Sequence, residues 1–472
     1  MNVKITLWVV IIFFMSTSFL PAQDSTSVER SGKLKNRIES IVKDIFKQVE
    51  KELGTTIYED DEEELEDDYI AEDENNDEEI EDKTDKLSLY AFPVDKGIVR
   101  NYSTKFISQN IEDKFLFRYN RVEGLFLGFQ SPQKFYWDEN RKFTLFGSLG
   151  YGFGEHRWRF NVGAAQQFGF GNHLFEFGIE GHSFADTRDN WLVGNLENTL
   201  SALVSRYDYR DHYGRNGYTG WLGLYVKKPT TDMQFKLSYL NDDYDSLSAK
   251  VNWSLFRTKK SFRENPAINP GEIRSLLFTF DLHNLSKSEY MPCGWSLSLS
   301  AEFAGKTLKG GYDFSRYVID LRRYQPISQY DNINLRLRAA TSEGNLPLQR
   351  MYELGGISTL PAFGYKQFAG NRLLLANIEY IVNGKMFAEG TDFPLSLLDN
   401  VNLILFTDAG FVDQVQDNLS LDSGFDNFTF KNIKSDVGFG FGTRDGKYRL
   451  GFAWRTDIKS PVSVFFRMNR PF

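Results

Sequence analysis

The residues best suited to chemistry are an acid and an imidazole two positions apart, Asp281 and His283. Residues two apart on a strand share a face, so the carboxylate could orient the imidazole as a general base. The favoured interpretation is plainer: a polar pair that makes hydrogen bonds inside a barrel. The chain has no Gly-x-Ser-x-Gly, His-Glu-x-x-His, Cys-x-x-Cys or P-loop pattern. The sequence therefore predicts a protein that is not an enzyme, with no cofactor and no metal site.

The elements that position these residues are expected to be β-strands, because apolar and polar residues alternate from about residue 114 onward. In residues 295–303 the odd positions are apolar, and the even positions carry Ser or Glu. The chain contains 42 Phe, 23 Tyr and 8 Trp, and membrane barrels use aromatic residues in their lipid-facing band and interfacial girdles. The pattern predicts an all-β fold, a transmembrane antiparallel β-barrel.

Sixteen segments between residues 143 and 472 are predicted as strands, among them 198–208 and 246–256. Residues 115–129 also alternate and would make a seventeenth strand. Single-chain bacterial barrels have even strand numbers, so one of these assignments must be wrong. We expect a sixteen-stranded barrel in residues 143–472, with residues 87–142 as a barrel entry segment or first strand.

The lengths of the connections predict which end of the barrel faces outward. Outer-membrane barrels have short periplasmic turns and long extracellular loops. Short turns are predicted at 169–172, 241–246 and 324–331. The long connections, which would be extracellular, are 185–197, 257–272, 342–370 and 413–432.

The chain begins with a pattern typical of export. Lys4, an apolar run over 5–15 and Ala22 before Gln23 predict a cleavable signal peptide in residues 1–22. A membrane anchor is less well supported, because the apolar run is shorter than the ~20 residues of a spanning helix.

Residues 23–58 are expected to form a periplasmic segment with an amphipathic helix. Apolar residues follow i, i+3, i+4, i+7 spacing between Leu34 and Leu53. Docking or self-association is the favoured role, and binding to a membrane surface is the alternative.

Residues 59–86 are expected to be an acidic disordered linker. Eighteen Asp or Glu residues and two Lys residues give it a net charge of −16, whereas the whole chain carries −9. Such a composition cannot bury a core. Asp73, Asn75 and Asp77 resemble part of a calcium-binding loop, but no glycine stands at its sixth position, so a solvated tether is favoured.

A glycine-rich stretch within residues 351–412 lies between alternating segments. It contains Gly355, Gly356, Thr359, Leu360, Pro361, Ala362, Phe363 and Tyr365, and a strand end with Asp408 and Gly410 follows. Glycines allow tight turns and close approach of backbones, and Asp408 needs water or a partner, because burying a lone carboxylate is costly. The stretch resembles the barrel of the BamA/TamA outer-membrane superfamily, the bacterial surface antigen barrels. In that family a long extracellular loop folds into the lumen.

The resemblance implies that residues 355–365 form the inward loop and that Asp408 and Gly410 contact it. Pro361 stands where the family carries an Arg, so a substitute cation is expected from Lys366 or Arg350. The family's periplasmic POTRA domains have no counterpart in the sequence before the predicted barrel. The resemblance implies insertion or translocation of protein or lipid at the bacterial outer membrane. The alternative is a pore or structural barrel without assembly activity.

The predicted last strand ends in Phe472, with Phe466 and Met468 on the same expected face. A terminal aromatic residue on such a strand resembles the signal read by the outer-membrane insertion machinery. Pro471 removes a ladder donor, so an ordinary closing strand is the alternative. The expected partners are outer-membrane lipid, that machinery and client membrane proteins. No basic stripe predicts nucleic-acid binding.

Overall fold

The computed structural model describes residues 114–137, 140–256, 260–287, 292–388, 400–416, 420–444 and 446–468. These residues belong to the second of two units into which the chain divides, Glu81–Phe472. The predicted signal peptide, amphipathic helix and acidic linker lie outside the described residues, as does Phe472.

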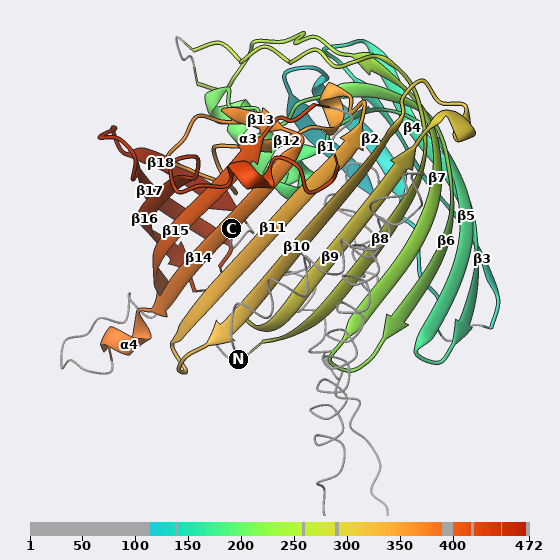
Figure 1. Ribbon diagram of the computed structural model, residues 1–472. Helices are drawn as coiled ribbons and strands as arrows, with labels where there is room; N and C mark the ends of the chain where they lie inside the picture. Colours follow the sequence, from blue (N-terminus) through green and yellow to red (C-terminus); the bar gives the residue numbers. More distant parts are fainter. Residues whose placement is uncertain are drawn as a thin grey trace, which may run out of the picture. The chain divides into compact units, whose positions relative to one another are not determined.

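The described residues form a sixteen-stranded antiparallel sheet, in which consecutive strands along the chain pair with each other, except that β11 pairs with β14 (Figure 1). Its strands are β1 (Phe115–Asn120), β2 (Gly124–Ser131), β3 (Lys142–Gly152), β4 (Arg157–Phe170), β5 (His173–Asp186), β6 (Tyr213–Lys227), β7 (Asp232–Ser246), β8 (Gly271–Lys287), β9 (Pro292–Ala304), β10 (Phe314–Pro326), β11 (Asp331–Gly344), β14 (Arg372–Asn383), β15 (Val401–Asp413), β16 (Lys434–Thr443), β17 (Tyr448–Arg455) and β18 (Ser463–Met468). The remaining strands, β12 (Tyr352–Leu354) and β13 (Phe368–Gly370), pair with each other. The prediction of an all-β fold with sixteen main strands is confirmed.

The helices are short and lie in the connections. They are α3 (Asn195–Ser205), α4 (Lys385–Ala388) and the 3-10 turns η3 (Asp189–Trp191), η4 (Lys306–Leu308), η5 (Leu348–Arg350) and η7 (Phe425–Asn427). In the described part of the chain, no helix has the length and apolar character needed to cross a membrane.

Alternating residues give the sheet two chemically different faces. On β4 the side chains of Trp158, Phe160 and Val162 are exposed, whereas Arg159 and Asn161 between them are buried. On β9, Ser296 and Glu302 are likewise buried. We call the face with the buried polar residues the inner face, because a strand bordered by lipid must carry its apolar side chains outward.

Two of the predicted strands are wrong. Residues 198–208 overlap helix α3, where Leu196, Leu200 and Val204 follow the spacing of a helix rather than that of a strand. Residues 246–256 begin at the last residue of β7 and continue into the connection to β8. This segment alternates, but it donates its Lys250 and Val251 N–H groups to the Arg121 carbonyl and joins no ladder.

The segment 115–129 supplies two strands instead of one. Asn120 turns the chain, because its side-chain oxygen accepts the N–H groups of Val122 and Glu123 at 3.0 and 2.7 Å. Gly124 follows with a φ of +65°, a conformation that glycine adopts without strain. The two strands gained here, β1 and β2, replace the two that were wrongly predicted, so the total remains sixteen.

The longest connections lie at one end of the sheet, except that 384–400, between β14 and β15, lies at the other. The predicted turns at 169–172 and 324–331 are short connections at one end, β4–β5 and β10–β11. The predicted turn at 241–246 is wrong, because those residues continue β7. The opposite end carries the long connections, among them 187–212, 247–270 and 345–371.

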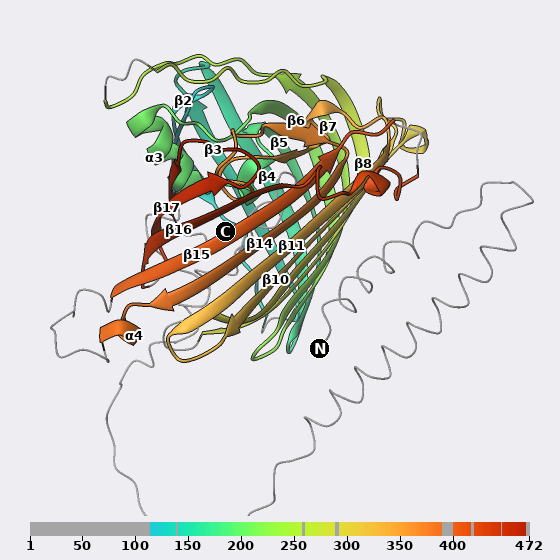
Figure 2. The ribbon, with the colours of Figure 1, turned by 60° about the vertical axis from the view of Figure 1, so that its left-hand side comes forward.

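The sheet has two edges, β1 and β18, and within the described residues no ladder joins them. We call the gap between these edges the seam. Helix α3 lies at the end of the sheet that carries the long connections (Figures 1 and 2).

Candidate site: the inward loop and the wall beneath it

The connection between β11 and β14, residues 345–371, folds back over the inner face of the sheet, and we call it the inward loop. β12 and β13 form its base. Gly355 and Gly356 start its tip with φ angles of +112° and +83°. A Cβ atom on Gly355 would lie 2.2 Å from the Gly364 carbonyl oxygen, so both backbone angle and space require glycine there.

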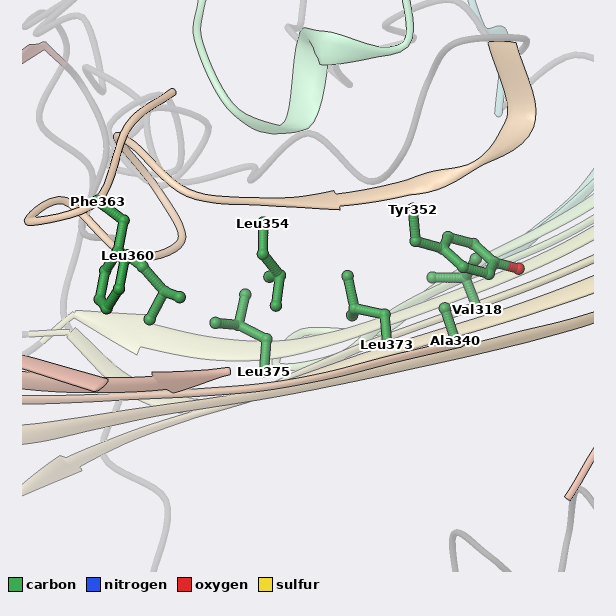
Figure 3. Packing of buried hydrophobic residues seen from close by; sticks show 8 residues of the cluster. All are labelled: Val318, Ala340, Tyr352, Leu354, Leu360, Phe363, Leu373 and Leu375. Atoms are coloured by element: carbon green, nitrogen blue, oxygen red, sulfur yellow. The ribbon is translucent and has the colours of Figure 1, made fainter. Parts of the chain in front are cut away.

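Apolar side chains hold the inward loop against the sheet. The cluster contains four loop residues and four wall residues: Tyr352, Leu354, Leu360 and Phe363 from the loop, and Val318, Ala340, Leu373 and Leu375 from the strands. Figure 3 shows the loop side chains pointing toward those of the wall. Removing this apolar surface from water stabilises the folded-back loop.

Gly410 leaves room for this packing. A Cβ atom at that position would lie 2.8 Å from Leu354 and 3.3 Å from Leu360 of the loop. Two residues predicted from the sequence as a loop and its contacting strand, Leu360 and Gly410, are thus brought together.

Beneath the tip of the loop, five polar residues stand side by side on five adjacent strands, and we call them the polar row. They are Arg336, Asn377, Asp408, Asp436 and Arg455. Each is the register partner of the next, so the row crosses β11, β14, β15, β16 and β17 at one level. All face inward, because residues directly opposite in a sheet point to the same face.

The polar row binds the tip of the loop through its backbone. Arg336 donates to the Ser358 carbonyl at 3.3 Å, and Asn377 donates to the Thr359 carbonyl at 3.0 Å. Asp436 accepts the Ala362 N–H at 2.9 Å. The polar row therefore provides hydrogen-bond partners for backbone groups of the loop tip. Buried without partners, these groups would destabilise the folded protein.

The far end of the row holds the loop by different contacts. The Arg455 guanidinium lies 4.4 Å from the centre of the Phe363 ring, a cation–π distance. Ser463 of β18 donates to the Pro361 carbonyl at 2.7 Å. The tip is therefore attached as far along the sheet as its last strand.

Asp408 contacts the loop through a neighbour. Its carboxylate accepts a 2.7 Å hydrogen bond from Asn377, whose other bond goes to the Thr359 carbonyl. Beside it lies a cavity of about 20 Å³, lined in part by Pro361, Asp408 and Arg467. That volume holds about one water molecule.

The expected substitute cations bind elsewhere. Arg350 pairs with Glu302 at 3.3 Å and donates to the Tyr244 hydroxyl at 2.8 Å. Lys366 pairs with Asp189 and Asp211 of the connection 187–212. The expectation that either one pairs with Asp408 is wrong, and a cation that does bond to the loop tip, Arg336, comes from the wall.

A second connection, residues 187–212, is fastened to the inward loop. Lys366 Nζ lies 2.8 Å from Asp189, 2.6 Å from Asp211 and 2.8 Å from Glu353. Burial opposes the lysine charge, but the carboxylates of Asp189 and Glu353 outweigh it and hold the pKa of Lys366 well above its ordinary value. The Tyr365 hydroxyl donates to the Tyr209 carbonyl of the same connection.

Asp281 and His283 are polar residues of the wall, and each contacts a serine. Asp281 accepts a hydrogen bond from Ser298 at 2.8 Å, and His283 Nδ1 lies 3.0 Å from the Ser296 hydroxyl. Both serines belong to β9, the neighbouring strand.

The residues predicted as an assembly signal do not share one environment. Phe466 is exposed, whereas Met468 is buried and donates its N–H to Glu197. Phe472 lies outside the described residues.

Sequence reasoning did not identify three residues that hold the loop: Asn377, Asp436 and Ser463. The available signal was a polar residue at an inward position of an otherwise apolar strand, as Asn377 is between Leu375 and Glu379 of β14. Linking it to Asp408 needs the register of β14 against β15, which the sequence does not state.

An antiparallel sheet with an apolar outer face, a polar inner face and a long connection folded against that inner face has the architecture of an outer-membrane β-barrel protein. The family model described as the Omp85 superfamily domain matches residues 153–456, and the chain belongs to that superfamily. The resemblance stated from the glycine-rich stretch is thereby confirmed. Proteins of this superfamily are bacterial outer-membrane barrels.

Solved structures with similarity to the chain include BamA from Haemophilus ducreyi lacking POTRA domains 1–3, at 14% identity and a TM-score of 0.44. That match covers 74% of this chain and 67% of the other. CdiB from Acinetobacter baumannii matches at 13% identity and a TM-score of 0.38, covering 72% of this chain and 55% of the other. CdiB from Escherichia coli matches at 12% identity and a TM-score of 0.38, covering 75% and 61%. No curated protein matches the chain.

Proposed function

We propose that this protein inserts or translocates protein or lipid at the bacterial outer membrane. The observation that carries the proposal is that, within the described residues, no ladder joins the two edge strands β1 and β18 in this member of the Omp85 superfamily. A sheet edge presents N–H and C=O groups to which a strand of another chain can pair. Strands β1 and β18 would be where a client meets this protein.

In this proposal the inward loop steadies the wall while the seam changes. The loop contacts β11 and every strand from β14 to β18, so it ties the last strands of the sheet together. Gly355, Gly356 and Leu360 shape and anchor the loop, and Asp408 and Gly410 belong to the surface that receives it. Outer-membrane lipid and client membrane proteins are the partners.

The alternative, a pore or structural barrel without assembly activity, has less support. A barrel that served only as a pore would be expected to close its wall with a ladder, because closure removes both sheet edges, and no ladder joins β1 to β18 in the described part of the chain. The inward loop and the connection 187–212 also occupy the end of the sheet that an open channel would need to keep clear.

We further propose that the segment before the barrel lies in the periplasm after removal of a signal peptide at residues 1–22. Phe466, Met468 and Phe472 would serve the assembly of this barrel by the outer-membrane insertion machinery. N-terminal sequencing of the mature protein tests the first point, and a start at Met1 would contradict it.

The test of the function is the outer-membrane proteome of a strain depleted of this protein. We expect loss of several unrelated barrels or surface proteins, with unfolded forms accumulating in the periplasm. Complementation with His283→Ala should restore the proteome as well as the wild type does, because the proposal gives that imidazole no chemical role. A proteome that is unchanged on depletion would remove the assembly function.

A further inference from the structure

Helix α3 contacts both edges of the sheet at once. Toward β18, the Glu197 carboxylate accepts the Arg467 guanidinium at 3.0 Å and the Met468 N–H at 3.2 Å. Toward β1, the Thr199 hydroxyl oxygen accepts the Tyr119 N–H at 3.3 Å. A helix in the connection between β5 and β6 therefore binds the first and the last strands of the sheet.

The two backbone donors that α3 binds are the ones a pairing strand would use. The Lys114 carbonyl accepts the Gln130 N–H of β2, so residues an even number of positions from Lys114 bond to β2. Tyr119 lies five positions away, and its N–H points from β1 into the seam. Met468 likewise directs its N–H away from β17, to Glu197.

The packing of the other faces of α3 also agrees with a position between the two edge strands. Ala202 packs with Tyr119 of β1 and with Phe262, and the Leu203 carbonyl accepts the Leu255 N–H at 2.7 Å. Opposite this face, Leu196, Leu200 and Val204 are exposed at a spacing of four residues. Phe117 of β1 and Phe466 of β18 are exposed as well.

Helix α3 makes few backbone hydrogen bonds to the two edge strands. β1 and β18 are each six residues long, and among the described contacts α3 bonds to one backbone N–H of each strand. An extended peptide can bond to every second residue of an edge. It would therefore make more backbone hydrogen bonds than the helix whose place it takes.

We propose that α3 is a built-in occupant of the seam, and that an extended polypeptide pairs with β1 or β18 only after α3 has left. The proposal rests on the proposed function and adds its regulation: the protein covers its own strand-binding edges. The inward loop shares in this control, because Lys366 holds Asp189 and Asp211 on either side of α3.

Two variants loosen α3 with little change in shape. Glu197→Gln weakens a charge-assisted contact with β18, and Thr199→Val removes the acceptor for β1 while keeping the side chain's volume. Leu200→Ala is the matched control, because Leu200 lies on the exposed face of the same helix. The full chain is used in detergent micelles, and folding is checked for each variant before measurement.

The first readout is binding of a fluorescent synthetic peptide that copies residues 461–472, together with amide hydrogen exchange in β1 and β18. Loss of the Thr199 acceptor should tighten peptide binding and speed exchange at Tyr119 about fivefold. Glu197→Gln should tighten binding on the order of tenfold and speed exchange at Met468. Leu200→Ala should match the wild type in both readouts. If either loosened variant folds and binds the peptide no better than Leu200→Ala, the proposal is overturned.

The second readout separates this proposal from the function on which it rests. The same proteins are placed in lipid vesicles, and insertion of an unfolded outer-membrane barrel is followed by its protection from protease. Faster insertion with Glu197→Gln and Thr199→Val supports both proposals. Tighter peptide binding without any insertion by wild type or variants supports α3 as the occupant and contradicts the insertion function. Insertion by the wild type, with peptide affinity unchanged in both variants, supports the insertion function and contradicts α3 as the occupant of the seam.

Discussion

The inward loop and helix α3 both come from long connections at the same end of the sheet, yet they are held by different contacts. The loop rests on an apolar cluster and a row of polar residues that crosses five strands in register. The helix meets the two edges through hydrogen bonds accepted by Glu197 and Thr199 and through the packing of Ala202 on Tyr119. Many cooperating contacts favour a fixed element, and few contacts favour one that can leave. We therefore expect the inward loop to stay docked on the wall and α3 to move away from the seam.

Lys366 joins the inward loop to the connection 187–212, which contains α3. Removing its charge should have the largest effect on amide hydrogen exchange of all the substitutions considered. Lys366→Met leaves Asp189 without this cation, whereas Asp211 keeps Arg121 and Arg263. Removing one partner of a buried ion pair typically costs about 3–5 kcal/mol. We expect the connection 187–212, including α3, to exchange its amide hydrogens much faster, while the apolar base of the inward loop stays protected. Hydrogen exchange resolved by peptide tests this. Equal loosening of both regions would contradict their division into a fixed and a movable part.

The charges at this joint also predict its response to pH. Burial opposes the charge of Asp211, but Lys366 and Arg263 outweigh it and lower the pKa of the carboxyl well below its usual range. A lowered carboxyl pKa stabilises the folded form above its unfolded pKa of about 4, and this contribution is lost as pH falls through the folded value. The raised pKa of Lys366 stabilises below about 10.4 and is lost as pH rises through its folded value.

Protease resistance of the connection 187–212 should therefore be flat between about pH 5 and pH 9. Its loss on the acid side should shift to higher pH, by about one unit, in Lys366→Met, because Asp211 then lacks its main opposite charge. An acid transition at the same pH in both proteins would show that Lys366 does not set the pKa of Asp211.

The fixed region should respond to a change in its apolar cluster. Leu360 is fully buried between loop and wall, and Leu360→Ala should destabilise the docked loop by about 3 kcal/mol through lost burial and a residual cavity. Leu348→Ala, an exposed position of the same loop, should change it by less than about 0.5 kcal/mol. Exchange of the amides in residues 351–370 reports both. A loop that stays equally protected in Leu360→Ala would place its anchor elsewhere.

The polar row should contribute less than the apolar cluster. Asn377→Ala removes the donor to both Thr359 and Asp408 and should cost about 2 kcal/mol. Asp408→Ala should cost about 1 kcal/mol, because Asn377 keeps its bond to the loop. If Asp408→Ala proves the more damaging of the two, the carboxylate itself holds the loop, and the indirect contact through Asn377 is not the important one.

The sequence was most informative where one residue type is required. Gly355 has a positive φ, which favours glycine, so the glycine-rich pattern could predict a tight turn there, whereas Gly410 was predicted from the resemblance to the superfamily. Alternation likewise predicted strands, since a wall between lipid and a polar interior must alternate. It failed at residues 198–208, where the apolar residues of α3 face outward next to the sheet and resemble a short strand.

The partners of charged loop residues could not be predicted from the sequence. Lys366 was expected to reach Asp408, 42 positions further along the chain, but it pairs with Asp189, 177 positions before it. Nothing in the local sequence states which long connection folds against which. The polar row was missed for the same reason, because Asn377, Asp408 and Asp436 become neighbours only when the register of three strands is known.

A small effect, of the same size as that of Asp408→Ala, is expected where an added methyl group of the wall would meet the loop. Gly410→Ala adds a methyl group 2.8 Å from a terminal carbon of Leu354, a flexible side chain that can shift by a few tenths of an ångström. The docked loop should lose about 1 kcal/mol through overpacking, and hydrogen exchange of β12 measures it. Gly181→Ala on β5 is the matched control, since an added Cβ there meets no atom within 4 Å. A loop as well protected in Gly410→Ala as in the control would mean that the contact between Leu354 and the wall is loose. The fixed region would then depend on its polar contacts, which reverses the order of effects predicted for Leu360 and Asn377.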